Sequence, residues 1–345
     1  MDFLGFSKDG KWYKGNLHSH TNHTDGKLTP KELVELYQKA GYDFLAITDH
    51  DVFYDYRETL QPDGMVLLPA VEASAYLVED TDFYHKVSQN KNADSLDILW
   101  DANKVGKCKK AHHINAILGT KAMQEMAELP LPEEGKLIPP PVYLNEWKGA
   151  EVLQTLVEDF KKRGFFVTYN HSTWSQVELE DVSGVDGIWA MEIYNYGTHI
   201  TNNACDETFV DNMMAHGNQM HILATDDNHN WNPDSFGGYI MVKAENLSHD
   251  TLVESMLAGN YYSSTGCEIY DWGIRNDEVF VACEDCKWIR FIINGCVGDG
   301  KIYRNEGEPL CVAKYKLKGT EKSVRVECIN HNGERAWTNF CMLQK

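Results

Sequence analysis

Short apolar runs typical of β-strands alternate with longer amphipathic segments over about residues 15–265. Residues 43–48 are one such run, and residues 29–42 form a predicted helix with Thr29 as N-cap and Pro30 in the first turn. Strands that alternate with helices favour a parallel sheet, and this many repeats in one domain favour a barrel over an open sheet. The predicted fold class is therefore α/β.

The pattern changes near Cys267, where short alternating strands without intervening helices begin. We therefore predict two domains, an α/β barrel over residues 1–266 and a small β-sandwich-like domain over residues 267–345. Within the first, about residues 75–110 and 120–146 are irregular. We interpret both as insertions over one end of the barrel, where long loops are often functional.

The net charge and the absence of a long apolar segment limit the partners that the chain is expected to bind. A formal charge of −20 over 345 residues weighs against tight binding to duplex nucleic acid or to anionic membranes. No apolar stretch is long enough to span a bilayer, and the first residues lack the features of a signal peptide. We expect a cytoplasmic protein that acts on a small molecule, with its nine cysteines as reduced thiols. The sequence leaves the oligomeric state open.

Histidines and carboxylates concentrate where the predicted strands finish. His18 and His20 lie two residues apart and so on one strand face, and Asp227 and His229 repeat this spacing. In a parallel barrel the carboxyl ends of the strands share one mouth, so these residues are expected to meet there. The candidate ligands are His18, His20, Asp25, His50, Glu72, His113, His171, Asp227 and His229.

Nine donors of this kind predict a metal site with more than one ion. Mixed histidine and carboxylate ligands suit zinc, manganese or iron, whereas magnesium and calcium prefer oxygen ligands alone. One tetrahedral ion needs about four ligands including water. We therefore expect two or three divalent ions, an arrangement that phosphoester hydrolysis uses.

These motifs together resemble the PHP (polymerase and histidinol phosphatase) superfamily. The resemblance rests on "HSH" followed by Asp25, and on "TDHD", "PAVEAS", "HHINAI", "YNHSTWS" and "TDDNH". The segments "WYKGNLHSHT", "LAGNYYSSTG" and "GERAWTNFCML" are similar to the two-domain branch that has a small C-terminal β domain. The resemblance covers nearly the whole chain.

The resemblance implies a distorted seven-stranded barrel with three metal ions at the carboxyl ends of the strands. A hydroxide that bridges two ions would attack phosphorus in line, without a covalent enzyme intermediate. The first ion would take His18, His20, Glu72 and Asp227. The second ion would share Glu72 and add His113 and His171. The third ion would take Asp25, His50 and His229.

Several neighbouring residues compete for these roles. His112 and His113 point to opposite faces of a strand, and we prefer His113, because it matches the His-x-Asn pattern of the family, with His85 as runner-up. The spacing to His229 selects Asp227 over Asp226. His23 is an alternative to Asp25, which the family spacing favours.

Four further signals are weaker. His199 is a candidate general acid for the leaving group. Arg57 and Lys86 lie in loops near the predicted mouth, although solvation is the preferred role for both. Cys283 and Cys286 form a Cys-x-x-Cys pair, but a zinc ribbon needs a second such pair and the sequence has none. We therefore interpret these thiols as buried residues of a small β core.

The leading hypothesis is a metal-dependent phosphoesterase that cleaves a small phosphorylated molecule. The alternative keeps the metal centre but hydrolyses a non-phosphate ester, an amide or a carbamate. A third hypothesis is a non-catalytic metal-binding module, against which the full ligand set argues. Phosphate release measured against ester or amide cleavage separates the first two.

Overall fold

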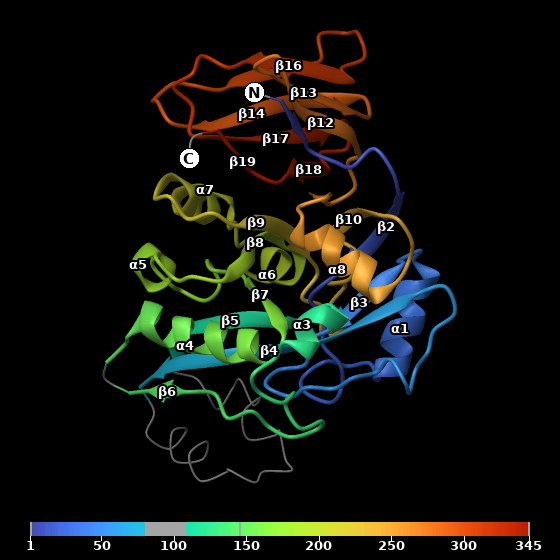
Figure 1. Cartoon of the computed structure of the whole chain (residues 1–345), viewed down its shortest axis with the longest axis vertical. Helices are drawn as coiled ribbons and strands as arrows, with labels where there is room; N and C mark the ends of the chain where they lie inside the picture. The colour runs from blue at the N-terminus through green and yellow to red at the C-terminus, as the bar shows by residue number, and fades with distance from the viewer. Residues whose placement is uncertain (1, 80–107, 145, 344–345) are drawn as a thin grey trace.

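The computed structural model describes residues 2–79, 108–144 and 146–343 (Figure 1). Its first and larger part is a mixed sheet with helices against it. The strands of this part are β2 (Lys11–Asn16), β3 (Phe44–Ile47), β4 (Val66–Val78), β5 (Cys108–Leu118), β6 (Val142–Tyr143), β7 (Phe165–Tyr169), β8 (Ile188–Asn195), β9 (His221–Thr225), β10 (Tyr239–Ala244) and β11 (Tyr261–Ser264). The helices are α1 (Pro30–Lys39), α3 (Lys121–Glu125), α4 (Gly149–Lys162), α5 (Leu179–Val182), α6 (Tyr196–Asn202), α7 (Glu207–Ala215) and α8 (His249–Leu257).

The prediction of an all-parallel sheet is wrong. The strand order is β11-β10-β2-β3-β4-β5-β7-β8-β9, and β5 is antiparallel to both of its neighbours. Strand β10 is also antiparallel to both β2 and β11. Alternating apolar residues show which face of a strand is buried, but they do not fix the direction of its neighbour.

The two ends of this series of strands approach each other without a full ladder between them. The segments that follow β2 and β9 are joined by an isolated parallel bridge between Ser19 and Asn228. The backbone N–H of His20 donates to the carbonyl of Asn228 at 3.0 Å, and that of Asp227 donates to the carbonyl of His18 at 3.0 Å. The sheet therefore curves round, but a closed seven-stranded barrel is not shown.

One apolar cluster fills the inner face of the curved sheet. It contains side chains from eight strands, β3 to β11 without the short β6, together with Leu252, Val253 and Met256 of α8. The strand members include Phe44, Ala46, Leu68, Ala70, Ile117, Phe166, Ala190, Leu223, Ile240, Val242 and Tyr261. Since strands this far apart in order share one cluster, the sheet wraps around it.

Alternate residues of the same strands face the helices. Leu45 and Ile47 of β3 pack with Leu33, Val34 and Tyr37 of α1. In α1, Thr29 and Glu32 form a reciprocal capping box, as the N-cap prediction requires. On the other strands, outward residues pack with α4 and α7 in the largest apolar cluster. The period of two thus separates an inner core from an outer core.

The C-terminal strands form a sandwich with two sheets (top of Figure 1). One sheet has the order β1-β12-β13-β16, and the other contains β15, β14, β17, β18 and β19. An apolar cluster lies between them. The strands are β1 (Phe3–Leu4), β12 (Ile269–Arg275), β13 (Glu278–Cys283), β14 (Cys286–Asn294), β15 (Lys301–Arg304), β16 (Val312–Lys316), β17 (Ser323–Asn330), β18 (Arg335–Thr338) and β19 (Cys341–Met342).

The sandwich is continuous with the larger sheet rather than tethered to it. Strand β18 pairs with β11, so the ladder crosses the predicted boundary at residue 266. Strand β1, from the start of the chain, pairs with β12. Arg325 is buried and holds Asp211 of α7 through two hydrogen bonds of 3.0 and 2.9 Å. The exact domain boundaries stay a prediction.

The two predicted insertions contain more regular structure than expected. Residues 75–78 belong to β4 and residues 108–110 belong to β5, while residues 80–107, including His85 and Lys86, lie outside the described residues. The second segment contains α3 and β6, and β6 pairs in parallel with β4. Ladder hydrogen bonds therefore extend these strands beyond what their sequence pattern indicated.

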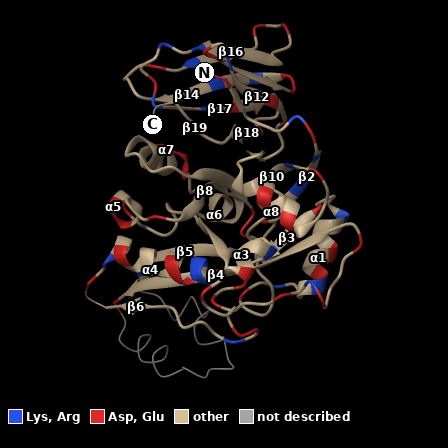
Figure 2. Cartoon of the chain, viewed as in Figure 1, with Lys and Arg blue, Asp and Glu red and all other residues tan. Residues whose placement is uncertain are grey.

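Two features bear on partners. In the described residues, no helix is long and apolar enough to cross a membrane. Figure 2 shows acidic residues in red on several helices, including α1, α4 and α8, with basic residues in blue among them. The acidic residues are thus spread over several elements of the fold.

Candidate metal centre

The inner face of the sheet changes from apolar to polar along its strands. In β4, Leu68 and Ala70 lie in the inner cluster, and Glu72 follows on the same side. Strand β5 is antiparallel, so its order reverses, and Ile117 in the cluster corresponds to His113 near the polar end. Period-two alternation therefore places all the polar side chains at one end of the curved sheet.

The first group consists of His18, His20, Glu72 and Asp227, whose ligand atoms all lie within 4.8 Å of one another. His18 Nε2 lies 3.2 Å from both Glu72 Oε1 and Asp227 Oδ1. His20 Nε2 lies 3.0 Å from Asp227 Oδ1 and 3.4 Å from Glu72 Oε2. All four residues are buried. They are the same four residues that the resemblance assigns to the first ion.

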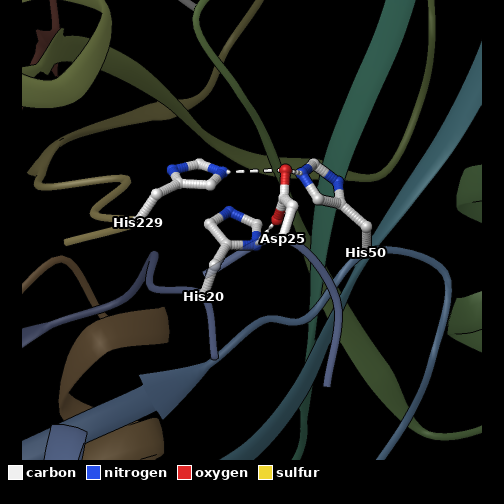
Figure 3. Close-up of side chains that lie close together, drawn as sticks. All are labelled: His20, Asp25, His50 and His229. Atoms are coloured by element: carbon white, nitrogen blue, oxygen red, sulfur yellow. Dashed lines mark ion pairs between the residues drawn. The ribbon is translucent and has the colours of Figure 1, made fainter. Parts of the chain in front are cut away.

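The second group consists of His20, Asp25, His50 and His229 (Figure 3). Asp25 Oδ2 lies 3.2 Å from His229 Nε2 and 3.6 Å from His50 Nε2. Figure 3 shows the imidazoles of His229 and His50 on opposite sides of the Asp25 carboxylate. The side chains of Asp25 and His229 are 29% and 27% exposed, so the centre opens to solvent on this side.

The third group consists of His50, Glu72 and His113. Glu72 Oε2 lies 2.9 Å from His50 Nδ1, and Glu72 Oε1 lies 3.1 Å from His113 Nδ1. His171 Nε2 lies 3.3 Å from the same Oε1 atom. The structure thus brings all nine predicted side chains into one connected cluster with Glu72 at its centre.

The residues present fit divalent metal ions. Among the described residues, His20 Nδ1 and His113 Nε2 are buried and make no hydrogen bond, whereas His18 Nε2 and Glu72 Oε2 face other members of the cluster at 3.2 and 2.9 Å. A buried polar atom without a partner is costly, and imidazole nitrogens and carboxylate oxygens are ligands of zinc, manganese and iron. Bound ions would satisfy these atoms.

Charge distribution within the cluster is uneven. Burial, together with repulsion from His229 and His50, lowers the pKa of His20 to about 3, so its imidazole is neutral, the form that binds metal. Burial also disfavours charge on His229, but Asp25 outweighs it and raises the pKa of His229 to about 10. For His50, burial is likewise outweighed by Asp25 and Glu72, and its pKa rises to about 8.

The carboxylates of the cluster are held ionised. Burial alone would raise the pKa of Glu72, but His18, His113 and His50 outweigh it and lower that pKa well below the ordinary value. The pKa of Asp25 is lowered in the same way by His50 and His229 despite its burial. Metal binding at such a site displaces protons from the histidines, so metal affinity should depend on pH.

The structure shows where the alternative candidates for the metal-ligand roles lie. His112 points away from the cluster, with Nδ1 2.9 Å from the hydroxyl of Tyr169 and Nε2 3.0 Å from the carbonyl of Gly149. Asp226 instead accepts hydrogen bonds from Tyr37 and from the backbone N–H groups of residues 236–238. The ring of His23 lies against two tyrosines, Tyr54 and Tyr56.

The weaker candidates make local contacts. His199 Nδ1 lies 3.2 Å from the carbonyl oxygen of Ala204, and its ring packs on Tyr194. The guanidinium of Arg57 donates to Asp55. In the part of the chain that the structure describes, neither side chain makes a hydrogen bond or an ion pair with the nine-residue cluster.

The sequence analysis missed Glu192. Its Oε1 lies 2.7 Å from His18 Nδ1, and its Oε2 accepts the backbone N–H of His171 at 2.8 Å. A carboxylate that holds the second nitrogen of a metal-binding histidine fixes the orientation of the ring. The available signal was a single carboxylate in an otherwise apolar strand, "GIWAMEIYN".

Buried asparagines complete the support of the centre. Asn170 Nδ2 donates to Glu72 Oε1 at 2.8 Å and to Asn115 Oδ1 at 2.9 Å. Asn195 Nδ2 donates to Glu192 Oε2 at 2.8 Å and to Asp227 Oδ2 at 3.1 Å. These amides satisfy carboxylate oxygens and so fix the carboxylates that face the histidines.

The backbone is strained where Asp227 enters the site. Asp227 has φ +52°, in the left-handed region that non-glycine residues rarely adopt. Its carbonyl oxygen would lie 2.7 Å from a Cβ atom at Gly197, so only glycine fits beside it. Strain of this kind typically occurs at functional sites, where the surrounding structure holds it.

Two indole rings lie at the edge of the centre. Trp174 is 41% exposed, and its ring centroid lies 5.0 Å from that of His171 and 5.5 Å from that of His113. Trp231 is 66% exposed, and its Nε1 donates to the backbone carbonyl of Asp25 at 2.6 Å. Each indole leaves part of its surface free to contact a bound molecule.

Comparison with solved structures gives distant similarities. A crystallised two-domain protein from Bacteroides vulgatus, containing a predicted PHP-like metal-dependent phosphoesterase, is 12% identical with a TM-score of 0.44, over 94% of this chain and 92% of that one. An amidohydrolase from Chromobacterium violaceum is 13% identical with a TM-score of 0.41, over 72% of this chain and 96% of that one. At these values neither likeness carries a conclusion about activity.

Comparison with protein families is more specific. No curated protein matches the sequence. The family model of the PHP domain matches residues 16–172. This range contains every member of the cluster except Asp227 and His229, which the fold brings to the others. Residues 16–172, somewhat less than half of the chain, are therefore similar to the PHP domain.

Proposed function

We propose that this protein is a metal-dependent hydrolase that cleaves a phosphoester of a small molecule. The observation that carries the proposal is the set of three ligand groups, each pair of which has one residue in common. The common residues are His20, His50 and Glu72. Together with the similarity to the PHP domain, these groups support two or three divalent ions, of zinc, manganese or iron. The cytoplasmic location stays a prediction.

Glu72 is placed to link neighbouring ions. Its Oε1 atom faces His18, His113 and His171 at 3.1–3.3 Å. Its Oε2 atom faces His50 at 2.9 Å and His20 at 3.4 Å. Because the two oxygens face different sets of histidines, Glu72 would supply a ligand atom to each of two neighbouring ions.

Bound divalent ions would supply Lewis acidity and a water of lowered pKa at neutral pH. The chain contributes a rigid support for them, since Glu192 orients His18 and the buried amides orient Glu72 and Asp227. Burial of the first group excludes bulk water from its side of the site. The partly exposed Asp25 and His229 mark the side from which a substrate would enter.

The surroundings of the opening suit a small molecule with an anionic group. Lys27 lies there, since its backbone N–H donates to the carbonyl of His229 and its Nζ lies 5.9 Å from the Trp231 ring centroid. Trp174 and Trp231 offer apolar surface for the remainder of the substrate. The phosphate would face Lys27 and the ion-binding groups, and the rest of the molecule would contact the indoles.

A non-phosphate ester, amide or carbamate is the second candidate substrate. The observation that favours it is the make-up of the cluster: among the described residues, its ion pairs join histidines to carboxylates and include no arginine. Enzymes that bind phosphate commonly use arginine as a bidentate clamp. The electrophile would then be a carbonyl carbon instead of phosphorus.

Turnover by the metal-loaded full chain tests the proposal. The protein is loaded separately with Zn²⁺, Mn²⁺ and Fe²⁺ and assayed for phosphate release from monoesters and diesters, and for cleavage of aryl esters and amides. We expect turnover in the phosphoester panel. Turnover only in the second panel would move the assignment to the second candidate, and no turnover in either would support a non-catalytic metal-binding module.

A further inference from the structure

A second cluster of ligand-type side chains lies in the C-terminal sandwich. It contains Cys267, just before β12, Cys283 at the end of β13, Cys286 at the start of β14, and Cys328 in β17. All four are free thiols, and each is at most 2% exposed. They belong to the apolar cluster between the two sheets.

Three of the sulfur atoms are spaced as the ligands of one ion are, and the sulfur of Cys267 lies against one of these three. Cys286 Sγ lies 3.6 Å from Cys283 Sγ and 3.7 Å from Cys267 Sγ. The sulfur atoms of Cys283, Cys286 and Cys328 all lie within 4.8 Å of one another. Four sulfurs in a tetrahedron with Zn–S distances of about 2.3 Å would be about 3.8 Å apart.

Packing alone does not require this arrangement. A buried thiol behaves as a small apolar side chain, and Cys341 shows this in the same core, where its Sγ lies 3.9 Å from the carbonyl oxygen of Met342. The sulfur atoms of Cys267, Cys283 and Cys328 instead converge on Cys286 from three parts of the chain, which are the segment before β12, the turn between β13 and β14, and β17.

We propose that Cys267, Cys283, Cys286 and Cys328 bind one zinc ion with a structural role. Thiolate-only sites select soft or borderline metals, and zinc with four cysteine ligands is a typical structural centre. Strand β13 belongs to one sheet of the sandwich and β14 and β17 to the other, so the ion cross-links the two sheets. The third and fourth ligands that a Cys-x-x-Cys pair requires come from Cys267 and Cys328, which the fold supplies.

The zinc site is separate from the histidine and carboxylate centre and does not depend on the proposed function. Figure 1 shows β13, β14 and β17 in the upper part of the molecule, and β4 and β5, which carry Glu72 and His113, in the lower part. The two centres also differ in ligand chemistry, since one contains only sulfur donors and the other only nitrogen and oxygen donors. A sulfur-specific measurement therefore reports on the new site alone.

X-ray absorption at the zinc edge and cobalt substitution test the proposal in the full chain. We expect a sulfur shell at about 2.3 Å in the zinc-loaded protein. The cobalt-loaded protein should show a thiolate-to-cobalt charge-transfer band, which is kept in His18→Ala and lost in Cys286→Ser. Cys341→Ser is the matched control, a buried cysteine of the same core, and should keep the band.

Absence of a sulfur shell from the zinc-loaded wild-type protein would overturn the proposal. A charge-transfer band that survives Cys286→Ser would also overturn it, and so would a disulfide between any two of the four cysteines in place of bound metal. If Cys286→Ser does not fold, the zinc-edge measurement on the wild-type protein decides the question.

Discussion

The two clusters of ligand-type residues are both buried, but they differ in what surrounds them. Around the histidine and carboxylate centre, Glu192, Asn170 and Asn195 hold the side chains by hydrogen bonds, and Asp25 and His229 are partly exposed. The four cysteines lie within an apolar cluster, and no more than 2% of any of the four residues is exposed. A polar, open surrounding suits a centre that binds and releases substrate, and an apolar, closed one suits a centre that stabilises the fold.

The difference also explains why one cluster is evident in the sequence and the other is not. Histidines at successive strand ends follow the order of the sheet, so their spacing predicts a common site. The cysteines come from the segment before β12, from the short turn that joins β13 to β14 across the two sheets, and from β17, which is distant in sequence. Only the pair in the turn, Cys283 and Cys286, forms a motif.

Removal of metal should cause the largest loss of activity among these predictions. It should also empty the two centres at different rates. A chelator should first remove ions from the centre that opens at Asp25 and His229, abolishing hydrolysis while the sulfur-bound ion remains. Metal content, hydrolysis and the zinc-edge sulfur shell are followed together over time. Loss of the sulfur shell before activity would contradict the contrast in exposure, and re-addition of Mn²⁺, Zn²⁺ or Fe²⁺ should restore turnover.

His18→Ala should lower hydrolysis by at least about 100-fold, which is beyond the effect typical of residues that only support a ligand. Its ring contacts Glu72, Asp227 and Glu192, so its removal breaks the first ligand group. The variant should hold less metal at this centre and keep the thiolate signal. His216→Ala, at an exposed position that ends α7, is the control and should change neither quantity. Equal effects of the two substitutions would count against the assignment.

Glu192→Gln should weaken metal binding by about 10- to 100-fold, the range for residues that orient a metal ligand. The amide keeps the shape of the carboxylate but removes the charge that pairs with His18. Metal affinity is measured by competition with a chelator. Glu327→Gln is the matched control, because Glu327 is also buried and paired, with Arg335 and Arg290, in the sandwich. It should lower the melting temperature and leave metal affinity at the histidine centre unchanged.

Trp174→Ala should raise KM by about 2- to 10-fold, the effect expected from loss of one aromatic contact. The ring lies against His171 and His113 with 41% of the residue exposed, so it is placed to contact substrate without holding metal. Steady-state kinetics and metal content are compared with those of the wild type. A loss of metal without a change in KM would instead make Trp174 a structural support of the histidines.

The sequence predicted much of the inner architecture and left out the directions of the strands. The helix predicted over residues 29–42 and the strand predicted over residues 43–48 are present as α1 and β3. The antiparallel setting of β5 was not predicted, because alternation defines a buried face and says nothing of the neighbouring strand. The same strand brings His113 to the centre from its N-terminal half instead of from its end.

The residues that hold the metal-ligand side chains in place were not predicted from the sequence, for a related reason. Glu192 and Asn170 contact the ligands from neighbouring strands, and such pairs depend on register, which only the folded sheet determines. A buried carboxylate in an apolar strand signals that it has a partner, but it does not identify that partner.

The sequence by itself determined which residue types are available and which face of each strand they occupy, since the period of two is a local property of the backbone. It therefore determined the histidine and carboxylate set and the existence of a polar end to an apolar sheet. Only the tertiary structure decided which of these atoms lie within 4.8 Å of one another, and which cysteines join Cys286. The physical reason is that distances between strands follow from register, direction and sheet curvature, which arise from contacts between residues far apart in the chain.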